Sequence, residues 1–177
     1  SEDRGLSYML SLTKYMNEIH PTKLILIGPL VNNENDSLIH DAISGSSLVS
    51  YLGPLKQSMA FEYIQSSDFG LALFKSVADY EFTDPNKIYE YMMLRTLYIA
   101  NDFNIWKERL DTVTKGIFVS ESQINRRLAE QVVALYFDKK KYNSAVEHNY
   151  NYIRDTYNWR ISEEPKLIKI YNKVLSQ

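Results

Sequence analysis

The sequence contains no cysteine, which excludes disulfide bonds and thiolate metal sites. Its histidines, His20, His40 and His148, lie far apart, and their spacing matches no metal-binding motif. No apolar run reaches the roughly 18 residues that a membrane-spanning helix needs, and no signal peptide is visible. We therefore expect no metal site, while the absence of cysteine leaves the redox compartment open.

An excess of positive charge is also missing, because 20 Lys and Arg residues stand against 22 Asp and Glu residues. This balance argues against a nucleic acid as partner, but it leaves room for one phosphorylated small molecule. The 177 residues, 45% of them hydrophobic, suffice for one domain with a buried core. Because the chain begins at Ser1, we expect it to belong to a longer gene product.

Helical and strand-like patterns alternate along the first two thirds of the chain. Apolar residues at three- and four-residue steps predict helices, and short continuous apolar runs predict buried strands. A polar loop is expected over residues 32–37, and a second loop over residues 75–85. Helices are expected over residues 5–19, 38–43 and 56–66 and after residue 85, and strands over residues 23–29, 47–54, 69–74, 96–101 and 116–120.

Apolar strands separated by single helices predict an α/β fold, namely a Rossmann-like parallel sheet with helices on both faces. We expect residues 1–121 to form this sheet core. Residues 122–177 carry three apolar stripes at helical spacing and form a helical C-terminal segment. These last helices either cover the sheet or reach toward a partner that the sequence does not contain.

In parallel sheets, ligands bind where the carboxyl ends of the strands meet the following loops and helices. Lys87 and Glu90 lie three residues apart, on one face of the first turn of the helix that follows the third strand. The helix N-terminus and Lys87 favour a phosphate, and the carboxylate of Glu90 suits a vicinal diol such as ribose. The alternative is an ordinary surface ion pair worth at most about 0.5 kcal/mol.

Other polar or flexible residues fall at the same edge of the predicted sheet. Gly28 and Gly53 follow the first two strands, either as parts of a binding rim or as simple turn glycines. Arg4 opens the first helix, where it either meets a phosphate or lies in solvent. Glu81 lies in an acidic loop that either reaches a sugar or is solvated.

The order of these segments resembles the C-terminal, donor-binding domain of the retaining GT-B glycosyltransferases that use nucleotide-activated sugars. DRGLSYMLSL resembles the family's lysine-glycine helix opening, with Arg4 in place of the lysine. KLILIG resembles the strand that ends in the family's glycine loop, and VSYLGPL with QSSDFGLALF resembles the block after it. DPNKIYEYMMLRTLYIAND resembles the segment with the donor-binding glutamate, and NWRISEEPKLIKIYNKVL resembles the terminal tryptophan and helix.

The resemblance implies a role for each candidate residue. Glu90 would hold the ribose of the nucleotide, with Asn86 and Lys87 beside the donor. Arg4 would contact the donor diphosphate, and the loop that contains Gly53, Pro54 and Leu55 would receive the base. No cofactor and no metal are implied, because basic side chains and helix N-termini neutralise the leaving diphosphate in such sites.

The sequence departs from the family pattern at three positions. Many relatives carry two glutamates separated by seven residues, and counting back from Glu90 places Phe82 at the first position, with Glu81 adjacent. Arg95 and Leu97 stand where glycine and proline are usual. These departures concern the contact with the donor sugar more than the contact with the nucleotide.

The resemblance thus implies the donor-binding half of an enzyme that transfers sugar, with retention, from UDP- or GDP-linked donors to a glycan or lipid-linked acceptor. The family's first strand and the N-terminal acceptor domain, the chain's own partner, would precede Ser1. The expected location is cytoplasmic, and peripheral association with the inner membrane face is left open. Polysaccharide biosynthesis is expected by family habit alone. A nucleotide-sugar epimerase of the same architecture and a non-catalytic, degenerate Rossmann-like module remain as alternatives.

Overall fold

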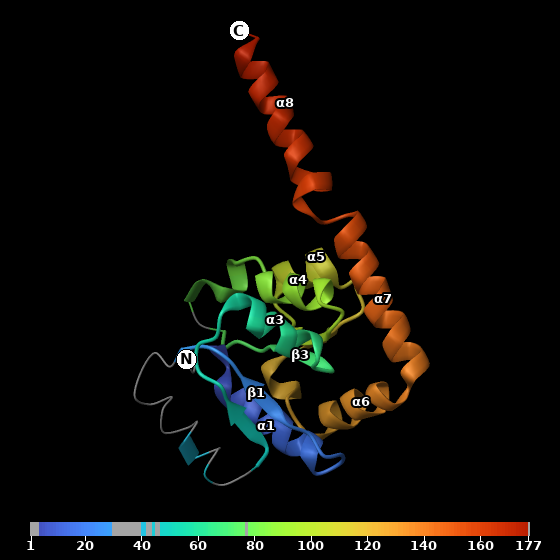
Figure 1. Cartoon of the computed structure of the whole chain (residues 1–177). Helices are drawn as coiled ribbons and strands as arrows, with labels where there is room; N and C mark the ends of the chain where they lie inside the picture. Colours follow the sequence, from blue (N-terminus) through green and yellow to red (C-terminus); the bar gives the residue numbers. More distant parts are fainter. Residues whose placement is uncertain (1–3, 30–39, 42–43, 45–46, 77, 177) are drawn as a thin grey trace.

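The computed structural model describes residues 4–29, 40–41, 44, 47–76 and 78–176 (Figure 1). The predicted loop over residues 32–37 and most of the helix predicted over residues 38–43 lie outside these ranges. The α/β elements in chain order are α1 (Leu6–Asn17), β1 (Leu24–Leu26), β2 (Val49–Tyr51), α3 (Gln57–Gln65), β3 (Phe69–Ala72), α4 (Asn86–Met93), β4 (Leu97–Asn101), α5 (Asn104–Leu110) and β5 (Ile117–Val119). The chain then forms α6 (Arg126–Phe137), α7 (Lys139–Asp155) and α8 (Glu164–Leu175).

All described strand pairs are parallel, which confirms the predicted class of fold. The strands form two ladders, however, where the sequence predicts one sheet. One sheet has the order β1-β2, and the other has the order β3-β4-β5. Ile99 of β4 pairs with Leu71 of β3 on one side and with Ile117 of β5 on the other.

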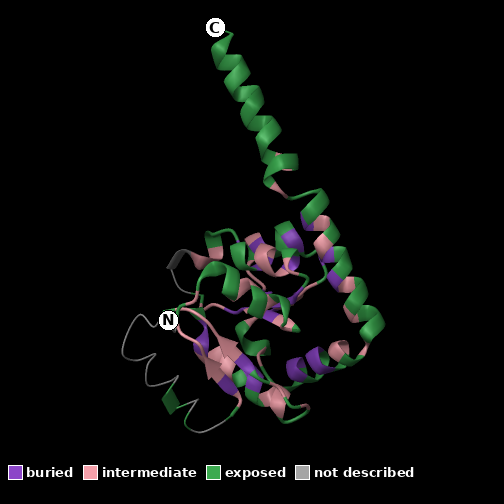
Figure 2. Cartoon of the chain, in the orientation of Figure 1, coloured by how far each residue is buried: buried purple, intermediate pink, exposed green. Residues whose placement is uncertain are grey.

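Helices cover both faces of the three-stranded sheet, because successive side chains of β4 point to opposite faces. Tyr98 and Ala100 pack with buried residues of α4, α5 and α7, among them Met92 and Trp106. Ile99 packs with Val119 and with buried residues of α1 and α6. The buried residues in Figure 2 concentrate around this sheet, which holds the hydrophobic core.

Two glycines allow aromatic rings to lie directly on the backbone. A Cβ atom at Gly116 would lie 2.0 Å from the Tyr98 ring, and one at Gly70 would lie 2.5 Å from the Tyr91 ring. Neither glycine has a left-handed backbone, so the reason for glycine here is space. The close contacts fix the third strand against α4 and the fifth strand against β4.

The strand β1 has an unpaired edge that faces away from β2. The N–H groups of Leu24 and Gly28 donate to the carbonyls of Leu48 and Gly53, and the Leu26 carbonyl accepts from Leu52 N–H. Because alternate residues of a strand direct their backbone groups to opposite sides, Ile25 and Ile27 face the side without β2. Within the described chain, no strand pairs with that edge.

Two of the C-terminal helices pack on the body, while the last projects from it (Figure 1). Helix α6 contacts α1, and α7 contacts α4 and buries Val146, Asn149 and Ile153. Helix α8 buries none of its residues. The prediction that C-terminal helices cover the fold is therefore confirmed for α6 and α7, while whether α8 reaches a partner stays a prediction.

The sequence misses one helix and part of one loop. Residues 104–110 form α5, although no helix is predicted there. The loop predicted over residues 75–85 contains a 3₁₀ helix, η2 (Ala78–Phe82). Further short helical turns are η3 (Glu121–Gln123) and η4 (Trp159–Glu163). Trp106 of α5 and Phe74 pack edge to face with ring centroids 5.6 Å apart, which ties α5 to the end of β3.

Candidate functional site

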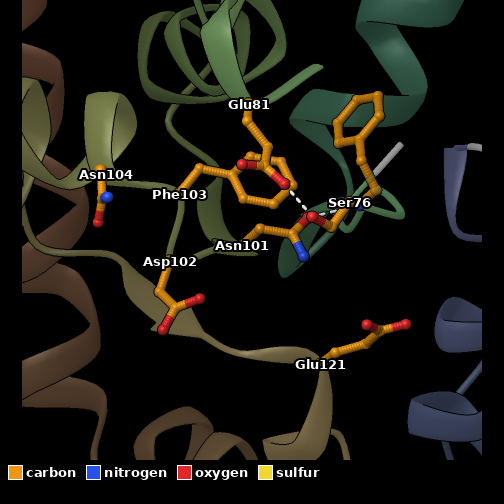
Figure 3. Close-up of a pocket in the computed structure, with 8 residues that line it drawn as sticks. Ser76, Glu81, Asn101, Asp102, Phe103, Asn104 and Glu121 are labelled. Carbon is orange, nitrogen blue, oxygen red and sulfur yellow. Dashed lines mark hydrogen bonds between the residues drawn. The ribbon is translucent and has the colours of Figure 1, made fainter. Parts of the chain in front are cut away.

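A pocket of about 220 Å³ opens at the carboxyl ends of β3, β4 and β5 (Figure 3). Its lining comes from residues that end or closely follow these strands and from the helix η2, at the edge where parallel sheets bind ligands. Two aromatic rings, a hydroxyl group, two amides and three carboxylates surround it. These lining residues are Phe74, Ser76, Glu81, Asn101, Asp102, Phe103, Asn104 and Glu121.

Packed aromatic rings support one wall of this pocket. The ring of Trp106 contacts Phe103 and Phe74 edge to face, with centroids 4.9 Å and 5.6 Å away. Its indole nitrogen donates to the carbonyl of Thr83 at 2.8 Å, and the residue is 2% exposed. The wall is therefore fixed by the core and does not depend on a ligand.

Asn101 ends β4 and is the most buried polar residue of the pocket, at 3% exposed. Its side-chain oxygen accepts a hydrogen bond from the backbone N–H of Phe74 at 2.5 Å. A backbone N–H is only a donor, so the amide oxygen must face Phe74 and the amide nitrogen must face the other way. Within the described chain that nitrogen has no partner, and a buried donor left unsatisfied costs about 1–3 kcal/mol.

Glu81, a residue predicted for the site, lines this pocket from η2. Its carboxylate accepts a hydrogen bond from the hydroxyl of Ser76 (Figure 3). The other predicted residues do not line the pocket. The structure therefore brings Glu81 together with Asn101, Asp102 and Glu121, which the sequence analysis does not single out. Each of the three residues ends or closely follows a predicted strand, and this position could have singled them out. Only the strand order shows that they lie close together.

Lys87 and Glu90 lie on the first turn and a half of α4, as predicted. The Lys87 ammonium group donates to the Glu90 carboxylate at 2.8 Å. The side chain of Lys87 is 51% exposed and that of Glu90 is 28% exposed, so Glu90 lies at the surface and outside the core. Asn86 starts the helix and is exposed, and no side chain caps this helix N-terminus.

The tyrosines on either side of Glu90 hold the helix in place. The Tyr91 hydroxyl donates to the Leu71 carbonyl at 3.1 Å, and the Tyr89 ring stacks on Tyr157 with centroids 4.7 Å apart. Burial raises the pKa of Tyr91 well above its ordinary value, and the charge of Glu90 adds to this. Burial likewise raises the pKa of Tyr89, followed by its hydrogen bond with Tyr157. Both phenols stay neutral and anchor α4.

Gly28 and Gly53 do come together, as predicted from their positions after β1 and β2. The Gly28 N–H donates to the Gly53 carbonyl at 3.0 Å, and the Tyr51 hydroxyl donates to the Gly28 carbonyl at 2.8 Å. Both glycines have positive φ angles, 138° and 69°, and a Cβ atom at either would meet nothing within 4 Å. Pro54 is exposed and Leu55 is partly buried in the following turn.

Arg4 is exposed just ahead of α1, where its guanidinium group is accessible to a ligand. The following Gly5 is the helix N-cap with a φ angle of 65°, and a Cβ atom there would lie 2.0 Å from the Leu73 carbonyl oxygen. This contact places the start of α1 beside the carboxyl end of β3. Arg4 therefore lies at the edge of the fold predicted for it.

Solved structures with the same arrangement of elements exist. Anabaena HepE in complex with UDP and glucose is 15% identical, with a TM-score of 0.72 over 99% of this chain and 46% of its own. AviGT4, a glycosyltransferase involved in avilamycin A biosynthesis, is 14% identical, with a TM-score of 0.60 over 87% of this chain and 46% of its own. TarM is 11% identical, with a TM-score of 0.73 over 97% of this chain and 32% of its own. The chain has the fold of a GT-B glycosyltransferase domain.

This GT-B domain spans less than half the length of the chains that it matches. No protein-family model and no curated protein sequence matches it. None of its described helices is long and apolar enough to cross a membrane. In the part of the chain that the structure describes, no three carboxylate or imidazole side chains are grouped so as to hold a metal ion.

The departures from the family pattern have structural consequences in this GT-B domain. Arg95 has a φ angle of 57°, a left-handed conformation that favours glycine. Its guanidinium group lies 3.6 Å from the Tyr150 ring centroid and donates to the Glu147 carboxylate at 2.9 Å. Leu97 is buried at 1% exposed, whereas Phe82 is 71% exposed. Arg95 thus joins the start of β4 to α7 with contacts that a glycine would lack.

Proposed function

We propose that the chain is the donor-binding half of a glycosyltransferase that uses a UDP- or GDP-linked sugar and a glycan or lipid-linked acceptor. The observation that carries the proposal is the fold, which is that of GT-B glycosyltransferase domains, with Lys87 and Glu90 at the opening of α4, the helix that follows β3. Their ion pair at 2.8 Å is by itself also what an ordinary surface pair would give. An ammonium group beside an uncapped helix N-terminus suits a diphosphate, and a carboxylate suits the ribose diol. The matched HepE structures hold UDP, which is consistent with such a ligand.

The proposed chemistry follows from these groups. The Lys87 ammonium group, Arg4 and the N-terminal N–H groups of α4 would stabilise the negative charge that develops on the leaving diphosphate. Glu90 would orient the nucleoside through its ribose, while the turn from Gly53 to Leu55 receives the base. We propose that no metal takes part and that the sugar keeps its anomeric configuration.

The rest of the enzyme is proposed to be an N-terminal domain of the same polypeptide, which would provide the acceptor pocket. Two surfaces of the chain support this. The edge of β1 formed by Ile25 and Ile27 has no strand beside it within the described chain, which leaves room for the family's first strand ahead of α1. Helix α8 exposes a row of apolar side chains, from Leu167 at 37% to Leu175 at 83%. We propose a cytoplasmic enzyme of polysaccharide biosynthesis, with peripheral membrane association of the full-length protein.

Titration calorimetry with UDP, GDP and UDP-glucose tests the proposal. Glu90→Gln removes the charge that would accept the two ribose hydroxyls, so we expect nucleotide binding to weaken about tenfold or more. Glu62→Gln, on the exposed side of α3, is the matched control and should bind as the wild type does. Nucleotide binding that Glu90→Gln leaves unchanged would overturn the assignment. Product analysis of the complete enzyme separates a new glycosidic bond from an epimer.

A further inference from the structure

The strand β5 has an open outer edge, on the side away from β4, that the proposed nucleotide site does not use. The Val119 carbonyl accepts a hydrogen bond from the Asp102 N–H, so Val119 and Ile117 direct their backbone groups toward β4. The N–H and carbonyl groups of Phe118 therefore point outward, where no strand of the described chain pairs with them. An edge of this kind is a template for a further strand.

A groove of about 320 Å³ opens between β5 and the start of α6 and gives a further strand room. All three residues of β5 line it, together with polar and apolar residues of α6 and of the turn before that helix. The full lining is Ile117, Phe118, Val119, Gln123, Asn125, Arg127, Leu128 and Gln131, of which Arg127 alone is charged. Backbone groups and uncharged side chains therefore dominate this surface, which suits an extended segment of polypeptide.

Hydrogen bonds within the chain limit the length of this open edge. At one end, the Ser120 N–H donates to the side-chain oxygen of Gln123 at 2.8 Å. At the other end, the Asn149 side chain accepts from the Lys115 N–H at 2.7 Å and donates to the Lys115 carbonyl at 3.3 Å. A segment that pairs with β5 is therefore short and centred near Phe118.

The residues around Phe118 are complementary to a second copy of themselves. Lys115 and Glu121 carry opposite charges at equal distances on either side of Phe118, and the β-branched Ile117 and Val119 flank it directly. In an antiparallel pair of identical strands centred on Phe118, each Lys115 faces the partner's Glu121, and each Ile117 faces the partner's Val119. Neither Lys115 nor Glu121 forms an ion pair within the described chain, so both charges are available.

We propose that the outer edge of β5 is the interface of a symmetric dimer, in which the β5 strands of two copies pair antiparallel about Phe118. The two Phe118 residues exchange one N–H···O bond in each direction, so the two three-stranded sheets become one. The twofold axis makes every other contact occur twice. Because a three-residue strand buries little area, we expect a weak dimer that forms between about 10 µM and 1 mM. The inference is independent of the proposed nucleotide site.

Charge reversal tests the dimer and its register, with sedimentation equilibrium of the 177-residue chain as the measurement. Lys115→Glu places like charges opposite each other at both ends of the strand pair, so the dissociation constant should rise about tenfold or more, and Glu121→Lys should do the same. The double variant restores opposite charges and should dimerise within about threefold of the wild type. Lys140→Glu and Glu62→Lys, at exposed positions of α7 and α3, are the matched controls and should leave the dissociation constant unchanged.

Hydrogen exchange at low and high protein concentration locates the interface. The Phe118 N–H should exchange fast in the dilute chain and slowly in the dimer, whereas Ile117 and Val119, which pair with β4, should be protected in both. A chain that stays monomeric up to about 1 mM overturns the inference. A dimer that both single variants leave intact, or that the double variant fails to restore, overturns it too, because another surface or register then holds the copies together. If a variant does not fold, the protection of Phe118 in the wild type decides alone.

Discussion

The two sheets of this molecule differ in how completely they are enclosed. Every residue of the central strand β4 is buried, and helices pack against both faces of its sheet. In β1 and β2 only Leu24 and Val49 are buried, at 7% and 9% exposed. The difference shows that the three-stranded sheet carries most of the stability of the fold. The two-stranded sheet still has partly exposed surface that further segments could contact.

The order of the strands indicates which edge of the two-stranded sheet is open. The order β2-β1 and then β3-β4-β5 matches the doubly wound order 3-2-1-4-5-6 with position 1 open between β1 and β3. Gly5 places the start of α1 beside Leu73, at the carboxyl end of β3, and α1 then leads into β1. A strand ahead of α1 would reach that open position by the usual right-handed crossover. This reasoning supports the proposal that a further strand of this same domain comes before α1.

Hydrogen exchange should reveal the largest difference between the sheets. The N–H of Ile27 has no partner in the described chain, so it should exchange at nearly the rate of an unstructured amide. Ile99, paired with strands on both sides, should be slower by a factor of about 10³ or more, since it opens only on global unfolding. NMR-detected exchange measures both.

A chain extended by the proposed strand ahead of α1 would sharpen this first prediction. We expect Ile25 and Ile27 to become protected in it, while Ile99 changes little. Equal protection of Ile27 and Ile99 in the 177-residue chain would show that the edge of β1 is already covered. That result would remove the support for the proposed strand ahead of α1.

The same substitution in each sheet should destabilise the chain to different extents. Ile99→Ala empties a site that is fully buried between the sheet and helices α1 and α6, and we expect a loss of about 4 kcal/mol in the free energy of unfolding. Ile25→Ala, in the half-buried β1, should cost less than about 2 kcal/mol. Urea denaturation measures both values, and equal losses would contradict the comparison.

The sequence predicts the strands better than it predicts their pairing. Each predicted apolar run contains a strand, although only β4 is buried along its whole length, while β1 and β2 are largely half-buried. The division into two sheets depends on contacts between distant segments, which periodicity does not record. Helix α5 is missed because Trp106 and Leu110 are the only buried residues of a short helix without a capping side chain.

For the candidate site, too, the sequence predicts neighbours along the chain but not contacts between distant segments. Lys87 and Glu90 are neighbours on one helix, so their spacing alone predicts the pair that the structure contains. Asn101, Asp102 and Glu121 come from the ends of different strands, and only the order β3-β4-β5 brings them together with Glu81.

Glycine substitutions compare the two sheets through steric clash and backbone strain, instead of through lost apolar contacts. Gly116→Ala would place a Cβ atom 2.0 Å from the Tyr98 ring in the closed core, so we expect a loss of about 3 kcal/mol. Gly53→Ala meets no atom within 4 Å but keeps a φ angle of 69°, so only about 1–2 kcal/mol of backbone strain is expected. Thermal unfolding of both variants shows which one loses more stability. A larger loss for Gly53→Ala would contradict the prediction that the steric clash at Gly116 outweighs the backbone strain at Gly53.

The smallest expected effect is a dependence on pH at the start of β3. The Tyr142 hydroxyl donates to the Asp68 carbonyl at 2.6 Å, and burial, followed by the charge of Asp68, raises the pKa of Tyr142 from 10.0 to about 12. Because the fold favours the neutral phenol, its contribution to stability is complete below pH 10 and is lost as the pH rises toward 12. Tyr142→Phe lacks the hydroxyl, so at pH 8 it should be less stable by about 1 kcal/mol.

The difference in stability between the wild type and Tyr142→Phe should shrink as the pH rises from 10, because only the wild type loses this contribution. Urea denaturation between pH 8 and pH 11 measures it, and a difference that stays constant would show that Tyr142 titrates alike in the folded and unfolded chains.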